Sequence, residues 1–446
     1  MTTSDALQFH AATDVGRVRD HNEDNFLVDK KLGLFIVADG MGGHAAGEVA
    51  SAVAVRTVHE ELKREVSMLT DFTQGARGAS RVTPTEISTL FEHAVLRACA
   101  KINELATADA AKRGMGTTLS ALLVLGQTAF IAHVGDSRIY LKRKDRVQQM
   151  TEDHTVYNEL IRKGKLSQEQ IAKIGSKKNA LMRAVGVYER VDVDTLVLEL
   201  VPGDTFLLAT DGLTQYLESN DELATALDAG ASDAPKALIA LANSRGGSDN
   251  ISVIVVGISG DSPEAEARAK RLALKREVLA KVPIFARLSE RELFRVMQVA
   301  ETQEYKAGEV LIREGDKGDE LFVVLSGTVG VTRGGSVLRH LTPGENFGEM
   351  ALIRAMPRSA TVTAEGPTEV LAIRRQDFYE ILRREHEIGV KMLWQFLGVL
   401  AERLDTTSSD LRNAREELAA EELEIAPDDE FSPFSLPVPP PTVRGR

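Results

Sequence analysis

The stretch "TLSALLVLGQTAFIAHVGDSRIYLKRKDRVQQM", Thr118 to Met150, carries the clearest signal of the fold. A first apolar run ends at Gly126 and Gln127, a second leads to a charged turn at Lys142 to Arg146, and a third follows. Loops of two residues join antiparallel strands, whereas parallel strands need long crossovers. The stretch therefore favours a mixed domain with antiparallel sheets over a doubly wound parallel sheet.

Helical segments flank this strand region. "EVASAVAVRTVHEELKREV" and "TEISTLFEHAVLRACAKINELA" carry apolar residues at helical spacing and are predicted to pack on sheet faces. The polar stretch from Asp71 to Thr85 between them is expected to be an exposed loop. Cys99 shares a helical face with Val95 and Ile102, which predicts a core position. Leu105 stands six residues after Cys99, where a cysteine nucleophile of the Cys-x₅-Arg type needs arginine, so that chemistry is excluded.

Composition limits the class of protein. The 446 residues are 43% hydrophobic and 27% charged, enough for two or three domains. One cysteine excludes a disulfide framework, and the N-terminal residues show no signal-peptide pattern. No apolar run approaches the ~18 residues of a membrane span. A net charge of -12 argues against nucleic acid as a partner. We expect a cytoplasmic protein that binds neither nucleic acid nor a membrane.

The organisation changes along the chain. A helix rich in Ala, Arg, Lys and Glu starts near residue 260, and glycines then recur between β-rich runs, which predicts a second, all-β core. The predicted fold class is α+β, with an α/β sandwich followed by a β-roll. The predicted divisions are an N-terminal sandwich domain (1–259), a helical connector (260–283), the β-roll domain (284–404), an extension of its last helix (405–425) and a disordered Pro-rich tail (426–446).

Acidic residues gather where apolar runs end. "LFIVADG" and "DTFLLATDGL" both finish in Asp-Gly. One Asp-Gly pair is ordinarily a turn, but repeated carboxylates beside a core repel one another unless cations compensate them. Oxygen ligands without a His or Cys cluster favour Mg²⁺ or Mn²⁺. The candidates are Glu23, Asp24, Asp39, Asp136, Asp211 and Asp249.

Seven ordered blocks, "GRVRDHNED", "VADGMGGHAAGE", "GMGTT", "VGDSRIY", "TEDHT", "LLATDGL" and "GGSDNIS", resemble the metal-dependent PPM, or type 2C, Ser/Thr protein phosphatases, especially bacterial members. The resemblance covers about Phe9 to Ile258. It implies two antiparallel sheets sandwiched between helices, with a binuclear metal site at one end.

The resemblance also implies roles for single residues. Asp39 matches the ligand that bridges two metals, and the Gly40 carbonyl a ligand of the second. Asp211 and Asp249 match ligands of the first metal. Glu23 and Asp24 match ligands that bind the second metal directly or through water. Asp136 matches a residue that, together with Asp211, holds a third ion in relatives.

Arg19 matches the arginine that binds the substrate phosphate. Eukaryotic relatives place the presumed general-acid histidine directly after Asp-Gly, but this sequence has Met41 there and a histidine at His44. His44 is a candidate general acid, and a metal-bound water is the alternative proton donor. If water is the donor, His44 has a structural role at the start of a helix.

The segment "PGENFGEMALIRAMPRSATV" resembles the phosphate-binding cassette of cyclic-nucleotide-binding domains, and the likeness covers about Ile284 to Leu411. The match assigns Glu349 to the ribose 2′-OH and Arg358 to the cyclic phosphate. Assisting groups would be Gly348, Ala351, Leu352 and Ser359, with Thr407 and Ser408 touching adenine across a dimer. cAMP is favoured over cGMP, and a β-roll retained without its ligand is the alternative.

The last predicted helix carries an apolar seam. Alternating four- and three-residue steps connect Leu393, Leu397, Leu400, Leu404, Thr407, Leu411, Ala414 and Leu418. The seam predicts a homodimer. Trp394 is interpreted as a core residue, with an aromatic lid over the nucleotide as the alternative.

Together these features predict a metal-dependent Ser/Thr protein phosphatase regulated by a cyclic nucleotide. Its substrates would be phosphorylated proteins, including Ser/Thr kinases or their targets. The alternative is an inactive, nucleotide-responsive scaffold that binds phosphoproteins.

Overall fold

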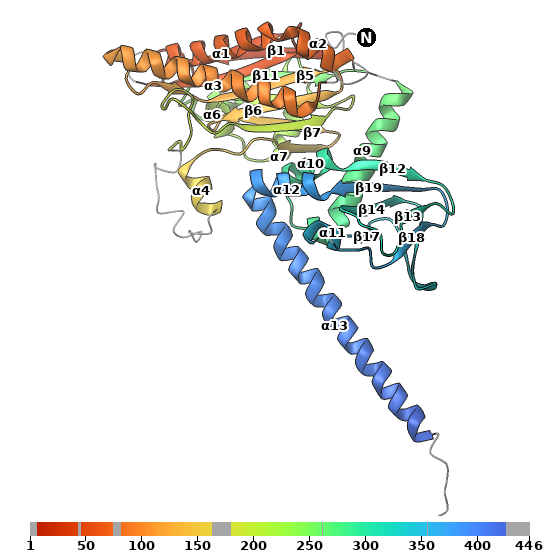
Figure 1. Ribbon diagram of the computed structural model, residues 1–446. Helices are drawn as coiled ribbons and strands as arrows, with labels where there is room; N and C mark the ends of the chain where they lie inside the picture. Colours follow the sequence, from red (N-terminus) through yellow and green to blue (C-terminus); the bar gives the residue numbers. More distant parts are fainter. Residues whose placement is uncertain are drawn as a thin grey trace, which may run out of the picture.

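The computed structural model describes residues 7–42, 46–74, 82–162, 180–260, 262–354 and 356–424. Two antiparallel sheets form the N-terminal part, and two smaller sheets with helices form the C-terminal part (Figure 1). Within these described ranges, no helix combines the length and the apolar character needed to cross a membrane.

The N-terminal sheets stack as a sandwich. The first sheet has the order β1-β11-β10-β7-β8 and the second the order β2-β3-β5-β6-β9, with β4 pairing β3, and all these pairs are antiparallel. This confirms the predicted fold class. The strands are β1 (Leu7–Asp14), β2 (Asp24–Asp29), β3 (Leu34–Met41), β4 (Gly116–Thr117), β5 (Leu119–Leu125), β6 (Thr128–Val134), β7 (Arg138–Arg143), β8 (Arg146–Gln149), β9 (Asp194–Glu199), β10 (Thr205–Ala209) and β11 (Ile251–Ile258).

Apolar side chains hold the layers together. One core lies between the two sheets and includes Phe35 and Phe206. A second core lies under α1 and α3 on the outer face of the second sheet, and a third lies under α7 and α8 on the first. Cys99 is fully buried in the second core, as predicted. The helices are α1 (Ala46–Arg64), α2 (Val66–Gln74), α3 (Pro84–Ala108), α4 (Val156–Arg162), α6 (Asp211–Thr214), α7 (Asn220–Asp228) and α8 (Ala234–Ser244), with the 3₁₀ turn η2 (Ala110–Lys112).

Two details differ from the sequence prediction. The second apolar run is two strands, because β6 and β7 belong to different sheets and residues 135–137 connect them. Gly135 permits this break with a φ of 113°. Helix α2 occupies Asp71 to Gln74, which the sequence assigned to an exposed loop.

The C-terminal part is a β-roll with helices on one side. Its sheets have the orders β12-β19-β14-β17 and β13-β18-β15-β16 and enclose a core that contains Phe322 and Phe347. The strands are β12 (Glu301–Tyr305), β13 (Val310–Ile312), β14 (Glu320–Ser326), β15 (Val329–Arg333), β16 (Ser336–Leu341), β17 (Asn346–Phe347), β18 (Thr361–Ala364) and β19 (Thr368–Arg374).

A second C-terminal core lies between the β-roll and its helices. The connecting helix α9 contributes Val278 and Leu279 to this core, so it is packed on the β-roll. The helices are α9 (Pro263–Lys281), η4 (Pro283–Phe285), α10 (Glu290–Val299), α11 (Met350–Ile353), α12 (Arg375–Arg384) and α13 (His386–Glu424).

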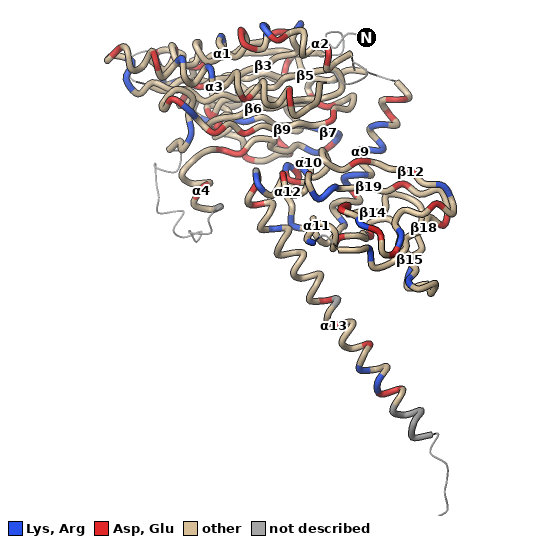
Figure 2. Tube along the Cα trace, viewed as in Figure 1, with Lys and Arg blue, Asp and Glu red and all other residues tan. Residues whose placement is uncertain are grey.

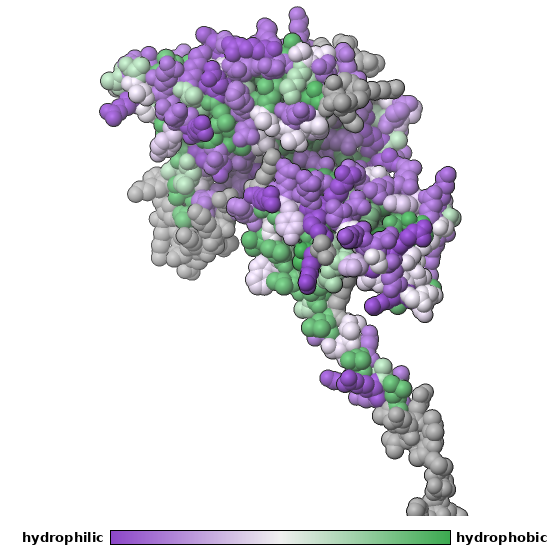
Figure 3. Space-filling view, in the orientation of Figure 1, coloured by the Kyte–Doolittle hydropathy of each residue, from purple (hydrophilic) through white to green (hydrophobic). Residues whose placement is uncertain are grey.

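Helix α13 begins in this core and then projects away from the rest of the molecule (Figure 1). Met392 and Phe396 are buried in the core, whereas Trp394 is 68% exposed in the single chain. The interpretation of Trp394 as a core residue is therefore wrong. Hydrophobic side chains recur along the projecting part (Figure 3).

Candidate functional site

The first candidate site lies where strands of both N-terminal sheets end. The antiparallel register of β2 and β3 places Asp24 opposite Asp39. The backbone of Asp39 is fixed on both sides: its N–H donates to Thr118 Oγ1 at 2.9 Å, and its carbonyl accepts from Thr117 Oγ1 at 2.8 Å. These bonds hold the predicted bridging residue in one position.

The other sheet supplies two more carboxylates, and the connection between the two sheets supplies a third. Asp211 opens α6 directly after β10, Asp249 precedes β11, and Asp136 lies in the connection between β6 and β7. The charges of Asp211 and Asp136 both act on Asp39, and that of Asp249 acts on Asp211. The predicted acidic residues of the two sheets therefore belong to one electrostatic cluster.

Burial makes this cluster hard to ionise. It raises the pKa of Asp39 well above the ordinary 3.8, and the charges of Asp24, Asp211 and Asp136 add to the effect. Burial also raises the pKa of Asp24 to about 7 and that of Asp136 to about 7. Without compensating positive charge, the cluster holds protons near neutral pH.

The donor set fits hard divalent cations. Asp24 Oδ2 accepts from Thr210 Oγ1 at 2.9 Å, but Asp24 Oδ1 and Asp211 Oδ1 are buried with no hydrogen-bond partner among the described residues. Buried oxygens without a donor are costly, and a cation would satisfy them. Within the described ranges, no group of three or more His, Cys, Asp or Glu side chains is arranged to hold an ion by itself. Backbone oxygens and water would have to complete the coordination, as they commonly do for Mg²⁺.

Gly40 lies in a very close backbone contact. A Cβ on Gly40 would stand 2.2 Å from the Gly47 carbonyl oxygen and 2.6 Å from that of Glu23. A Cβ on Gly47 would likewise stand 2.6 Å from Glu23 Oε2. Glycine is therefore required at both positions, and the Glu23 carboxylate lies beside this glycine pair.

Arg19 supplies positive charge at the cluster. Its side chain is 52% exposed, and its Nη2 donates to Asp249 Oδ2 at 2.9 Å. The charge of Asp249, followed by those of Glu23 and Asp39, raises the pKa of Arg19. The guanidinium thus lies beside the acidic cluster and remains accessible to an incoming anion. His44, the candidate acid, lies outside the described residues.

Sequence reasoning missed Asn250. Its Nδ2 donates to the carbonyls of Val15 and His21 at 3.0 Å each, and its Oδ1 accepts from the Glu23 N–H at 2.9 Å. This buried amide holds the loop that carries Arg19 and Glu23 against β11. Its place next to Asp249 in "GGSDNIS" was the available signal.

The second candidate site lies in the β-roll. Arg358 Nη1 donates to the Glu320 carbonyl at 2.9 Å and lies 3.4 Å from that of Gly348, while the guanidinium carbon stands 5.8 Å from the Phe322 ring centroid. Burial lowers the pKa of Arg358. Glu349 is only 5% exposed. The structure therefore brings together the cassette residues Gly348, Glu349 and Arg358.

The remaining cassette residues are arranged differently. Ala351 and Leu352 are buried in α11, directly after Glu349, whereas Ser359 is exposed beside Arg358. Thr407 and Ser408 are exposed on the projecting part of α13, so a single chain does not bring them to the cassette (Figure 1).

Comparison with known proteins separates the two parts. The family model for protein phosphatase 2C matches residues 17–236. A serine/threonine phosphatase of Listeria innocua is 40% identical over 248 residues, which are 55% of this chain and 93% of that protein. The chain belongs to the protein phosphatase 2C family. Its enzyme class is accordingly that of the Ser/Thr protein phosphatases.

Further matches involve the same part of the phosphatase chain. The protein phosphatase PhpP of Streptococcus pneumoniae is 34% identical over 263 residues, 58% of this chain and 100% of that protein. A solved Mycobacterium tuberculosis Ser/Thr phosphatase, PstP, is 31% identical, with a TM-score of 0.49 over 57% of this chain and 99% of that chain. The cyclic nucleotide-binding domain model matches residues 302–385, so the phosphatase carries a domain of this second family after its sandwich.

Proposed function

We propose that the phosphatase hydrolyses phosphoserine and phosphothreonine in proteins at the acidic cluster with two Mn²⁺ or Mg²⁺ ions, and that cyclic nucleotide binding to the C-terminal domain regulates this reaction. The proposal assigns residues 1–259 to catalysis, 260–283 to the connector, and 284–404 to the sensor. A cytoplasmic setting is part of it, because cyclic nucleotides and phosphoproteins occur there.

One observation carries the catalytic proposal. Two buried carboxylate oxygens, on Asp24 and Asp211, have no partner within the described chain, and they lie in a cluster whose pKa values are raised. A fold that only bound phosphoproteins would gain nothing from this unfavourable burial of charge. The observation therefore favours the enzyme over the scaffold alternative.

Each acidic residue has a proposed role. Asp39 would bridge two ions, with Asp211 and Asp249 on one of them and the Gly40 carbonyl on the other. Glu23 and Asp24 would serve the second ion directly or through water, and Asp136 with Asp211 would hold a third. When bound, such ions supply a Lewis acid and an activated water for in-line attack on phosphorus.

Arg19 would hold the substrate phosphate. Its pair with Asp249 engages Nη2, and the planar guanidinium presents further N–H donors that suit two phosphate oxygens. The leaving alkoxide needs a proton, for which His44 and water are the two candidate sources.

The cassette geometry supports nucleotide binding. Glu349 would accept from the ribose 2′-OH, and Arg358 would exchange its backbone carbonyl partners for the cyclic phosphate, a stronger, charged acceptor. The backbone groups of Gly348, Ala351 and Leu352 and the Ser359 hydroxyl would assist. We propose cAMP as the preferred ligand over cGMP.

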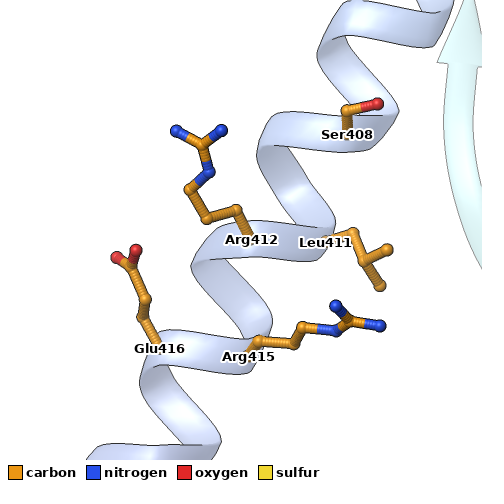
Figure 4. Close-up of a pocket in the computed structure, with 5 residues that line it drawn as sticks. All are labelled: Ser408, Leu411, Arg412, Arg415 and Glu416. Carbon is orange, nitrogen blue, oxygen red and sulfur yellow. The ribbon is translucent and has the colours of Figure 1, made fainter.

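The seam of α13 supports a homodimer. Its apolar side chains repeat at coiled-coil spacing, and single exposed helices of this kind are stabilised mainly by packing against a partner. Those that are more than half exposed are Leu393, Leu397, Leu404, Leu411 and Leu418. One hollow of the helix surface is lined by Ser408, Leu411, Arg412, Arg415 and Glu416. Ser408, Leu411 and Arg415 point to one side of the helix, and Arg412 and Glu416 point to the other (Figure 4). In a dimer, Thr407 and Ser408 would reach the partner subunit's nucleotide.

The test is metal-dependent hydrolysis of p-nitrophenyl phosphate and a phosphothreonine peptide by the full chain, titrated with cAMP and cGMP. Asp39→Asn should abolish phosphate release, because it removes the bridging carboxylate. Asp145→Asn, in the exposed turn between β7 and β8, is the matched control. An active Asp39→Asn variant would refute the metal assignment, and a wild-type chain without activity in Mn²⁺ or Mg²⁺ would favour the scaffold.

A further inference from the structure

Helix α10 belongs to the C-terminal part by sequence but contributes to both halves of the molecule. Phe294, 7% exposed, lies in the core between the two phosphatase sheets, and the Arg143 guanidinium carbon stands 5.7 Å from its ring centroid. Leu293 and Val296 lie instead in the core beside the β-roll. Met297 packs against both cores. Any displacement of this helix must therefore disturb the packing of both domains.

Arg291 fixes the helix to the phosphatase domain. Its Nη1 donates to Glu152 Oε2 at 2.8 Å, and its Nη2 donates to Asp194 Oδ2 at 3.0 Å. The Arg291 side chain is 16% exposed, and basic and acidic residues adjoin around α10 in Figure 2. Because a buried guanidinium that loses its partners is strongly unfavourable, this pair of contacts sets the position of α10.

Asp194 and Glu152 connect Arg291 to two histidines, His154 and His133. Asp194 also accepts from Arg183 Nη1 at 3.0 Å, and Arg183 lies 3.3 Å from His154 Nε2. The Glu152 carbonyl lies 2.9 Å from His133 Nε2. Burial, followed by the charge of His154, lowers the pKa of His133 to about 3, so its ring stays neutral at physiological pH.

Buried hydrogen bonds continue from His133 to the acidic cluster. His133 Nδ1 lies 2.8 Å from Ser120 Oγ, which also lies 2.9 Å from the Ser137 carbonyl. Ser137 Oγ lies 2.7 Å from Thr118 Oγ1, the group that accepts from the Asp39 N–H. Ser137 also follows Asp136 directly. A continuous set of contacts thus joins Arg291 to two of the proposed metal ligands.

The nucleotide cassette reaches α10 from the other side. Leu352, three residues after Glu349, lies in the same buried core as Leu293. Ion pairs then tie α10 to the helices that follow the β-roll. These pairs are Arg295 with Glu385 at 2.9 Å and Lys391 with Glu292 at 2.8 Å.

We propose that α10 couples nucleotide occupancy to the phosphatase centre and that Arg291 is the positioning residue of this coupling, acting through Glu152 and Asp194. The inference rests on the proposed regulation and names the contact that carries it. A nucleotide that moves α11 and the adjoining core shifts α10, and Arg291 then changes the positions of the segments that end at Asp39 and Asp136. For equilibrium binding, the same linkage requires Mn²⁺ and phosphate at the phosphatase centre to change nucleotide affinity by the factor by which nucleotide changes their affinity, whereas the change in kcat/KM need not be equal.

The experiment compares full-length wild type, Arg291→Met and Glu152→Gln. For each, kcat/KM in Mn²⁺ is measured with and without saturating cAMP and cGMP, and the Kd of each nucleotide is measured with and without Mn²⁺ and inorganic phosphate. The wild-type ratios should differ from one, by about 5- to 150-fold for typical coupling. Arg291→Met should bind nucleotide within about twofold of wild type yet give ratios near one in both measurements, a loss of coupling in both directions that mere destabilisation would not produce.

Glu152→Gln keeps the side-chain shape and a neutral acceptor, so it serves if Arg291→Met folds poorly, and it should lose part of the response. Arg339→Met, on the exposed strand β16, is the matched control and should respond as wild type does. Wild-type coupling that persists unchanged in both Glu152→Gln and Arg291→Met would overturn this inference and leave the proposed function intact. Ratios of one in the wild type with nucleotide bound would overturn the proposed regulation and this inference together.

Discussion

Replacing Asp24 by asparagine should stabilise the metal-free phosphatase at alkaline pH, although it removes a proposed metal ligand. Asp24 is 8% exposed, and burial raises its pKa from 3.8 to about 7. Each pKa unit is worth about 1.4 kcal/mol, so ionising this carboxylate in the folded state costs at most about 4 kcal/mol. Asparagine has nearly the same shape, keeps an acceptor for Thr210 Oγ1, and carries no charge.

The sign of the pH dependence follows from the raised pKa of Asp24. The folded state holds its proton up to about pH 7, whereas the unfolded chain releases it near pH 4. The Asp24 contribution to the free energy of unfolding is therefore highest below pH 4 and falls as the pH rises to about 7. Asp24→Asn should equal wild type at pH 4 and exceed it at pH 8.

Calorimetry of the full chain in EDTA, at several pH values and with or without Mn²⁺, measures the difference. The transition that moves with Mn²⁺ identifies the phosphatase domain. At about 2–4 °C per kcal/mol, the variant should melt up to about 16 °C higher at pH 8 without metal. Wild type should gain about 2.7 kcal/mol from Mn²⁺ at 100 times its Kd, and the variant clearly less. A variant that melts below wild type at pH 8 in EDTA would refute the argument from burial.

Two further predictions concern the C-terminal part. Arg358→Ala should weaken cAMP binding at least about 30-fold in calorimetric titration, because loss of a buried charge partner costs about 2 kcal/mol or more. The hydrolysis of p-nitrophenyl phosphate without nucleotide should be unchanged. Wild-type affinity in the variant would contradict the cassette assignment. Leu404→Asp combined with Leu411→Asp should convert the proposed dimer to a monomer in sedimentation experiments, because these side chains are 68% and 55% exposed in the single chain. A dimer that persists would place the interface elsewhere.

Local pattern was enough to predict the sheets and the acidic strand ends. A two-residue turn at Gly126 and Gln127 requires antiparallel strands, and an apolar run that ends in Asp39 places that residue near the end of a strand. The break between β6 and β7 escaped prediction because the two strands follow one another with only residues 135–137 between them, and only tertiary packing assigns them to different sheets. Trp394 escaped it because Met392 and Phe396 occupy the face of α13 that packs in the core, and Trp394, two residues from each, lies on another face.

Sequence patterns did not predict the contacts that α10 makes with the phosphatase domain. Arg291 pairs with Glu152 and Asp194, which are 139 and 97 residues away in the sequence, and no local motif predicts such pairs. Phe294 has the spacing of an ordinary core residue, and sequence alone does not say to which of two cores it belongs. The hydrogen bonds through the Ser120 and Ser137 hydroxyls could not be predicted either, because a serine in or beside a strand carries no pattern that identifies its partner.

Because Phe294 completes the phosphatase core, the two domains are not interchangeable modules. A chain that ended at residue 259 would lack Phe294 from the core between its sheets, and Glu152 and Asp194 would lack Arg291. A recombination that replaced the C-terminal domain by another sensor would expose the same phosphatase residues. Polar residues would have to replace the apolar ones in the same step. Heritable change should therefore preserve this pair of domains as one unit, even where selection for the nucleotide response is relaxed.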